Sequence, residues 1–183
     1  MTGSRPTQRY GALSIGLHWL MLLLIVAVYA CMELRGLAPR GSALRASLKQ
    51  WHFMLGLSVL LLVALRLAAR LLGGTPPISP APPPWQERLS RLMHLVLYAL
   101  MVGMPVAGWL ALSAAGKPIP FFFGLQLPAL IAENQDLAET IEELHEAGAS
   151  LGYFLIGAHA AAALFHHYVM GDNTLRRMLP ARR

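Results

Sequence analysis

The sequence predicts an all-α integral membrane protein, one four-helix bundle with both termini in the cytoplasm. Of its 183 residues, 56% are hydrophobic and only 13% are charged, whereas soluble domains carry roughly 25% charged residues. Four long apolar stretches can each reach the ~20 residues that a transmembrane helix needs. No sequence period suggests a repeat architecture, so we expect a single domain over residues 1–183.

The four helices are expected at about residues 13–33, 49–72, 89–115 and 144–171. The first is a clean apolar run. The second reaches spanning length only by continuing past Arg66, which requires Arg66 and Arg70 to extend toward the headgroups or to pair inside the bundle. The third ends loosely around Pro105. In the fourth, the run 147–171 is charge-free but carries three histidines.

The distribution of basic residues predicts the topology. Four spans put both termini on one side, which holds ten arginines, against five basic residues on the other side. Cytoplasmic segments carry the excess of Lys and Arg, so the termini are expected in the cytoplasm. The first apolar run exceeds the ~7–15 residues of a signal-peptide core, so we expect it to remain as a helix. The ten arginines on the side of the termini are Arg5, Arg9, Arg66, Arg70, Arg88, Arg91, Arg176, Arg177, Arg182 and Arg183. The five basic residues on the other side are Arg35, Arg40, Arg45, Lys49 and Lys117.

Composition also excludes several classes of protein. The single cysteine, Cys31, rules out a disulfide scaffold, a haem attached through Cys-x-x-Cys-His and a cluster held by several thiolates. In so apolar a chain, the net charge of +6 indicates the basic flanks of membrane spans rather than nucleic-acid binding.

The histidines are the chemically informative residues, because ionisable groups within membrane spans are rare and usually functional. A lone histidine in a bundle is more often a hydrogen-bonded core residue, but the spacing here suggests pairs. His145 and His159 share one helix face at depths ~21 Å apart. His52 is expected at the depth of His145, and His18 near that of His159. The seven are His18, His52, His94, His145, His159, His166 and His167.

Two histidine pairs at two depths suit two bis-histidine haems, since neutral imidazole ligates iron without adding charge to the bilayer. Zinc is the main competitor, but it prefers three or four ligands close together. Gly148, Gly152 and Gly157 either admit a flat macrocycle or simply let helices pack. Arg66, 14 residues after His52, should lie near the inner pair, where it either compensates a haem propionate or snorkels.

Three histidines remain. His94 and His166 belong at the inner lip, where they either bind a quinone carbonyl, relay protons or are merely solvated. His167 points away from the face of His159. His94 is also the rival of His18 as an inner ligand.

The sequence resembles the bacterial cytochrome b561 family nearly end to end. The resemblance rests on His18-Trp19, on the runs 32–36 and 75–78, and above all on the stretch from Leu151 to Leu175. It is most similar to members of the inner membrane that oxidise superoxide and reduce ubiquinone. The resemblance implies a diheme cytochrome b in which the fourth helix ligates both haems. Carried over, it assigns His18 and His159 to the inner haem, and His52 and His145 to the outer haem.

The resemblance further implies that periplasmic superoxide gives up an electron at the outer side and that ubiquinone is reduced to ubiquinol. Arg35, Arg45 and Lys49 are expected to steer the superoxide anion, although the acidic run 133–146 opposes such steering. The alternative is an electron-carrying membrane anchor for a partner dehydrogenase or periplasmic redox protein, and a non-haem transporter is a third hypothesis. Expected partners are membrane lipid, quinone and superoxide, with the chain a monomer or weak dimer and no nucleic acid bound.

Overall fold

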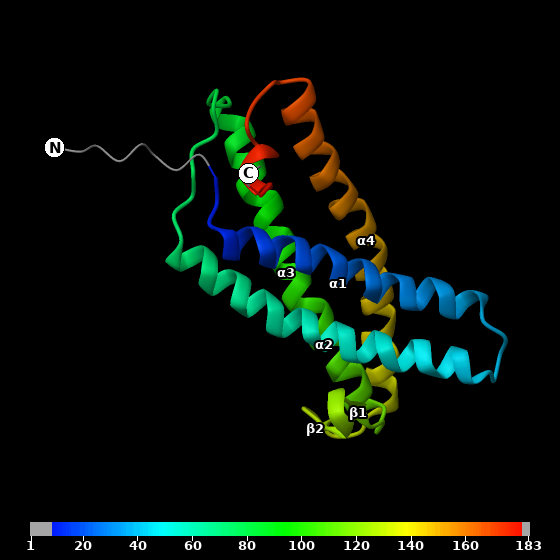
Figure 1. Ribbon diagram of the computed structural model, residues 1–183. Coiled ribbons are helices and arrows are strands. Elements are labelled where there is room, and N and C mark those ends of the chain that lie inside the picture. The colour runs from blue at the N-terminus through cyan, green and yellow to red at the C-terminus, as the bar shows by residue number, and fades with distance from the viewer. Residues whose placement is uncertain (1–8, 181–183) are drawn as a thin grey trace.

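The computed structural model describes residues 9–180, and four long helices make up most of that range (Figure 1). They are α1 (Ala12–Leu37), α2 (Ala43–Leu72), α3 (Pro84–Ala114) and α4 (Gln135–Tyr168). Each contains an apolar window long enough to cross a membrane. The expected all-α membrane bundle is therefore confirmed. The sidedness of the termini stays a prediction, and Arg5, Arg182 and Arg183, which contribute to it, lie outside the described residues.

Three helices begin earlier than the apolar pattern indicates. Helix α3 begins at Pro84 rather than near 89, with that proline in its first turn. Helix α2 begins at Ala43 rather than near 49, because the Ser42 hydroxyl accepts a hydrogen bond from the Arg45 N–H and caps its first turn. Helix α4 begins at Gln135 rather than near 144, where the Asn134 side chain caps the Leu137 N–H in the same way. These added turns are polar, so hydropathy gives no sign of them.

The helices form two antiparallel hairpins, α1–α2 and α3–α4, which cross each other (Figure 1). Within the described residues, the backbones of the two hairpins approach most along α2 and α3. Side chains connect α1 to α4. The Tyr29 hydroxyl donates to the Ala149 carbonyl at 2.9 Å, and the Tyr153 hydroxyl donates to Glu33 at 2.7 Å.

The core between the hairpins is apolar. Met21 of α1 and Val59, Leu62 and Val63 of α2 form a buried cluster, against which Tyr98 of α3 packs. Because lipid tails are as apolar as these side chains, the cluster holds the helices together through close packing.

We call the end of the bundle where α1 begins and α4 ends the terminal end, and the opposite end the distal end. At the distal end, β1 (Ile119–Pro120) pairs antiparallel with β2 (Gln126–Leu127), around a short turn of 3-10 helix, η1 (Phe122–Gly124). At the terminal end, the segment after α4 includes η2 (Arg176–Met178). This segment is joined to α1 by the Trp19 indole N–H, which donates to the Met178 carbonyl at 2.7 Å.

Candidate functional site

One histidine pair lies in the distal half of the bundle. The rings of His52 on α2 and His145 on α4 have centroids 6.1 Å apart. The His52 Nδ1 lies 3.1 Å from the Val28 carbonyl oxygen, so that nitrogen carries the proton and donates it. Its Nε2 is then free to ligate a metal, and a backbone partner on the other nitrogen is typical of metal-binding histidines. Gly108 of α3 leaves room for His145, because a Cβ there would lie 3.3 Å from the ring.

A second group of histidines lies in the terminal half. The centroids of His18 on α1 and His159 on α4 are 6.5 Å apart, and His94 on α3 lies 5.3 Å from His159. Two imidazoles on opposite sides of one metal, each with a metal–nitrogen bond of about 2 Å, have centroids roughly 6 Å apart. The spacing of His18 and His159 fits that geometry better than the spacing of His94 and His159. However, His94 donates from Nδ1 to the Ser90 carbonyl at 2.6 Å, as a ligand would.

Both pairs cross from one hairpin to the other: His52 faces His145 from α2, and His18 faces His159 from α1. All four side chains are only half-buried. The Nδ1 atom of His18 is buried without a hydrogen-bond partner. Paired neutral imidazoles in an apolar setting are the donor set that b-type haem requires, so these residues fit the group.

The glycines of α4 differ in what lies next to them. A Cβ at Gly152 would overlap the Tyr29 hydroxyl, and a Cβ at Gly148 would lie 2.6 Å from the Met104 sulfur. These two glycines therefore admit side chains from α1 and α3, which is the packing alternative of the sequence analysis. A Cβ at Gly157 meets nothing within 4 Å.

A positively charged group lies near the distal pair. The Lys49 ammonium sits 5.7 Å from the centre of the Phe53 ring, and the charges of Arg35 and Lys117 act on it. Arg35 also acts on His52, and its Nε is buried without a partner. Sequence reasoning did not place Lys117 in the site, because the contact depends on how the loop after α3 folds back on α2. The nearby carboxylate of Glu142 offsets part of this positive charge.

Arg45, which the sequence analysis groups with Arg35 and Lys49, binds backbone carbonyls. Its guanidinium donates to the carbonyl of Arg35 at 2.8 Å and to that of Ala38 at 3.2 Å. These are backbone groups at the end of α1, where carbonyls lack partners within the helix. Arg45 therefore ties the start of α2 to the end of α1.

Arg66 lies near the terminal pair, where the sequence places it. Its charge acts on both His18 and His159. Its guanidinium carbon lies 5.9 Å from the centre of the Tyr98 ring. Sequence reasoning missed Tyr98, which reads as one more apolar residue of the third span.

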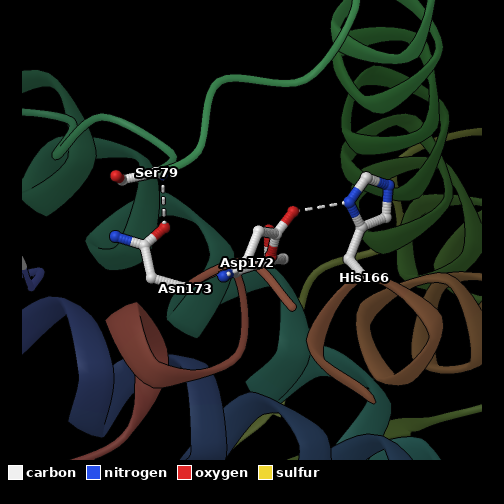
Figure 2. A network of polar contacts seen from close by, with 5 residues as sticks. Ser79, His166, Asp172 and Asn173 are labelled. Carbon is white, nitrogen blue, oxygen red and sulfur yellow. Dashed lines mark hydrogen bonds and ion pairs between the residues drawn. The ribbon is translucent and has the colours of Figure 1, made fainter. Parts of the chain in front are cut away.

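His166 is held by an acidic residue beyond the end of α4. Its Nδ1 lies 2.7 Å from Asp172 Oδ2 (Figure 2). Burial alone raises the pKa of Asp172, but hydrogen bonds from Thr174 and from His166 outweigh burial and hold the pKa below its usual value. Asp172 is therefore an ionised acceptor with only 4% of its surface exposed. Neither Asp172 nor this contact was anticipated from the sequence.

The same segment closes the terminal end of the bundle. The Asn173 side-chain oxygen accepts from the Ser79 N–H at 2.9 Å, and the Asn173 N–H donates to the Ser79 carbonyl at 3.1 Å (Figure 2). Ser79 belongs to the proline-rich link between the hairpins. His167, next to His166, stacks edge-on against Tyr168 and is not part of the pair with Asp172.

Comparison with known proteins covers the whole bundle. The model of the prokaryotic cytochrome b561 family matches residues 9–181. Cytochrome b561 homolog 1 of Escherichia coli K12 is 39% identical over 96% of this chain and 99% of its own length. The probable superoxide oxidase CybB of Yersinia pestis is 42% identical over 96% of this chain and 98% of its own. Cytochrome b561 homolog 2 of Escherichia coli K12 is 27% identical over 98% of this chain and 95% of its own length.

Proposed function

Because this chain belongs to the prokaryotic cytochrome b561 family, we propose that it is a superoxide:ubiquinone oxidoreductase with two b-type haems. Family membership makes it a haem-binding, multi-pass protein of the bacterial inner membrane that transfers electrons. The observation that carries the step to two haems is the pairing of four histidines at two depths. The name of the Yersinia relative and the basic group near the distal pair support superoxide as the donor.

We assign His52 and His145 to the distal haem, and His18 and His159 to the terminal haem. Bound haem supplies an iron that takes up and releases single electrons. A haem held by two histidines would have no open coordination position, which would favour electron transfer over oxygen binding. Arg66 compensates a propionate of the terminal haem in this arrangement. The ligand to be tested against His18 is His94, whose Nδ1 contact resembles that of His52.

At the distal end, the proposed periplasmic side, Arg35 and Lys49 attract superoxide, with Lys117 adding to their field. Each superoxide anion loses one electron and leaves as dioxygen. Two such oxidations supply the two electrons that, with two protons, convert one quinone to quinol. The role left for Arg45 is structural, since its guanidinium is bound to the end of α1.

At the terminal end, we assign His166 to the quinone. Its Nδ1–H is bound by Asp172, so Nε2 is the nitrogen available to a quinone carbonyl. An imidazole held by a carboxylate can pass a proton to the reduced quinone oxygen and be reprotonated from the cytoplasmic side. His94 and Arg66 lie deeper, beside the histidine pair, so His166 is the better candidate for the quinone.

Rapid mixing tests this proposal. Purified, oxidised protein is mixed with a pulse of superoxide, and haem absorbance is followed in milliseconds with and without a soluble quinone. We expect fast haem reduction that quinone reverses. Arg35→Gln with Lys49→Gln should slow the reduction and weaken its dependence on salt, whereas Arg40→Gln in the exposed link serves as control. Haems that stay oxidised under superoxide but reduce with dithionite would refute superoxide as the donor.

A second function is favoured by the acidic start of α4. Six exposed carboxylates gather there, at Glu133, Asp136, Glu139, Glu142, Glu143 and Glu146. Such a surface suits a basic periplasmic redox protein, which would deliver electrons to a membrane anchor. Isolation from the native membrane separates the two functions, because a stoichiometric redox partner supports the anchor and its absence argues against it.

A further inference from the structure

The hydroxyl of Tyr98 lies in an apolar part of the bundle without a hydrogen-bond partner. Tyr98 packs from α3 against the cluster of Met21, Leu62 and Val63. Its oxygen is buried, and no acceptor among the described residues receives its proton. Burying an unpaired hydroxyl is unfavourable, and phenylalanine would fill the same space without that penalty. The hydroxyl therefore needs an acceptor from outside residues 9–180.

The surroundings of Tyr98 indicate the chemistry of that acceptor. The Arg66 guanidinium carbon lies 5.9 Å from the centre of the Tyr98 ring, and its charge reaches His18 and His159. Within residues 9–180, no Asp or Glu forms an ion pair with Arg66. A cation at membrane depth is costly unless it is paired or reaches water, and an anion is the strongest partner for it. The Arg66 guanidinium and the hydroxyl of the ring it approaches both offer hydrogen-bond donors to one carboxylate, whereas a neutral quinone would leave the cation uncompensated.

We propose that the Tyr98 hydroxyl donates a hydrogen bond to a propionate of the terminal haem and shares that carboxylate with Arg66. The inference rests on the proposed function, because it requires a haem at His18 and His159. Tyr98 is then a positioning residue, which fixes the acidic edge of the haem against α3. It also tunes the haem, because a donor to the propionate reduces the negative field that stabilises ferric iron.

The test is the midpoint potential of the terminal haem in Tyr98→Phe, which keeps the ring and removes only the oxygen. We expect both haems to be bound and the terminal potential to fall. A tenfold change in the oxidised-to-reduced ratio corresponds to ~59 mV for one electron, and we expect a shift of up to that size. Tyr29→Phe is the matched control, because the Tyr29 hydroxyl is already bonded to Ala149 and should leave the terminal potential unchanged.

Infrared difference spectra of protein carrying 13C-labelled haem propionates give a second readout. Removing the hydroxyl should shift the carboxylate band of the terminal haem, and Arg66→Gln should shift the same band. The two potential changes should fall short of additivity in the double variant, because both groups act on one acceptor. An unchanged potential together with an unchanged band in Tyr98→Phe overturns the proposal.

If Tyr98→Phe loses haem, the hydroxyl's role is tested instead by placing fluorotyrosine at position 98 and measuring the terminal potential. It is a stronger donor of similar size, so the terminal potential should rise, and no rise would count against the hydroxyl. Failure of the underlying function looks different. His18→Ala and His159→Ala proteins that each retain two haems would overturn the terminal haem itself, whereas a silent Tyr98→Phe in a diheme protein overturns only the hydroxyl's role.

Discussion

The contact between Tyr29 and Gly152 predicts opposite outcomes for the same mutation at two glycines of α4. A Cβ at position 152 would overlap the Tyr29 hydroxyl, whereas a Cβ at position 157 meets nothing within 4 Å. Replacing glycine by alanine within a helix gains roughly 1 kcal/mol of intrinsic helix stability. Gly157→Ala should therefore be neutral or stabilising by up to about 1 kcal/mol.

Gly152→Ala should lose more than it gains. Displacing Tyr29 breaks its 2.9 Å bond to the Ala149 carbonyl, worth about 1 kcal/mol, and inserting an atom into packed space adds typically 1–3 kcal/mol. Set against the helix gain, the net loss is about 1–3 kcal/mol. Removing the obstructing oxygen with Tyr29→Phe should cancel most of that loss, because the Tyr29 Cζ would stand at 3.6 Å from the new Cβ.

Reversible unfolding in detergent micelles measures these free energies, with far-ultraviolet circular dichroism reporting helix content and the Soret band reporting haem. Four proteins complete the cycle: the wild type, the two single variants Tyr29→Phe and Gly152→Ala, and their combination. Gly157→Ala serves as the control for helix propensity. If Gly152→Ala is as stable as Gly157→Ala, the close approach of α1 and α4 at Tyr29 is refuted.

Three further outcomes follow from the site. His52→Ala should lose the distal haem alone, and His18→Ala the terminal haem alone, as counted by pyridine haemochrome and by the two redox steps. Retention of both haems in His18→Ala would give its role to His94. Because the pKa of Asp172 is held below its ordinary 3.8, its contacts add stability that is present above that value and lost as pH falls through the lower, folded-state pKa. Between about pH 5 and pH 2, the wild type should therefore lose more unfolding free energy than Asp172→Asn, and parallel curves would show that these contacts contribute nothing.

Much of the architecture follows from patterns that depend on one helix at a time. Apolar length locates the four spans, and the 14-residue spacing of His145 and His159 puts both on one face of α4. Apolar length does not predict the polar first turns of α4. Outside the apolar region a helix is stabilised by capping and helix propensity, as at Asn134. Hydropathy therefore locates the membrane-spanning part of a helix better than its ends.

The residues that sequence reasoning missed all depend on contacts between elements. The charge of Lys117 acts on Lys49 only because β1 and the distal loop pack against α2, and Tyr98 approaches Arg66 only where α3 crosses α2. Asp172 holds His166 because Gly171, with φ of +69°, turns the chain back after α4. Spacing along one helix carries no information about any of these three contacts.

The division of the bundle into two hairpins has a consequence for biogenesis. Each hairpin brings a pair of apolar helices into the bilayer and satisfies its own backbone hydrogen bonds, so each can insert without the other. The proline-rich link leaves the pairs free to meet afterwards, and the histidines that face one another come from different pairs. If the facing histidines form the proposed ligand sets, those sets can be completed only after both hairpins have inserted.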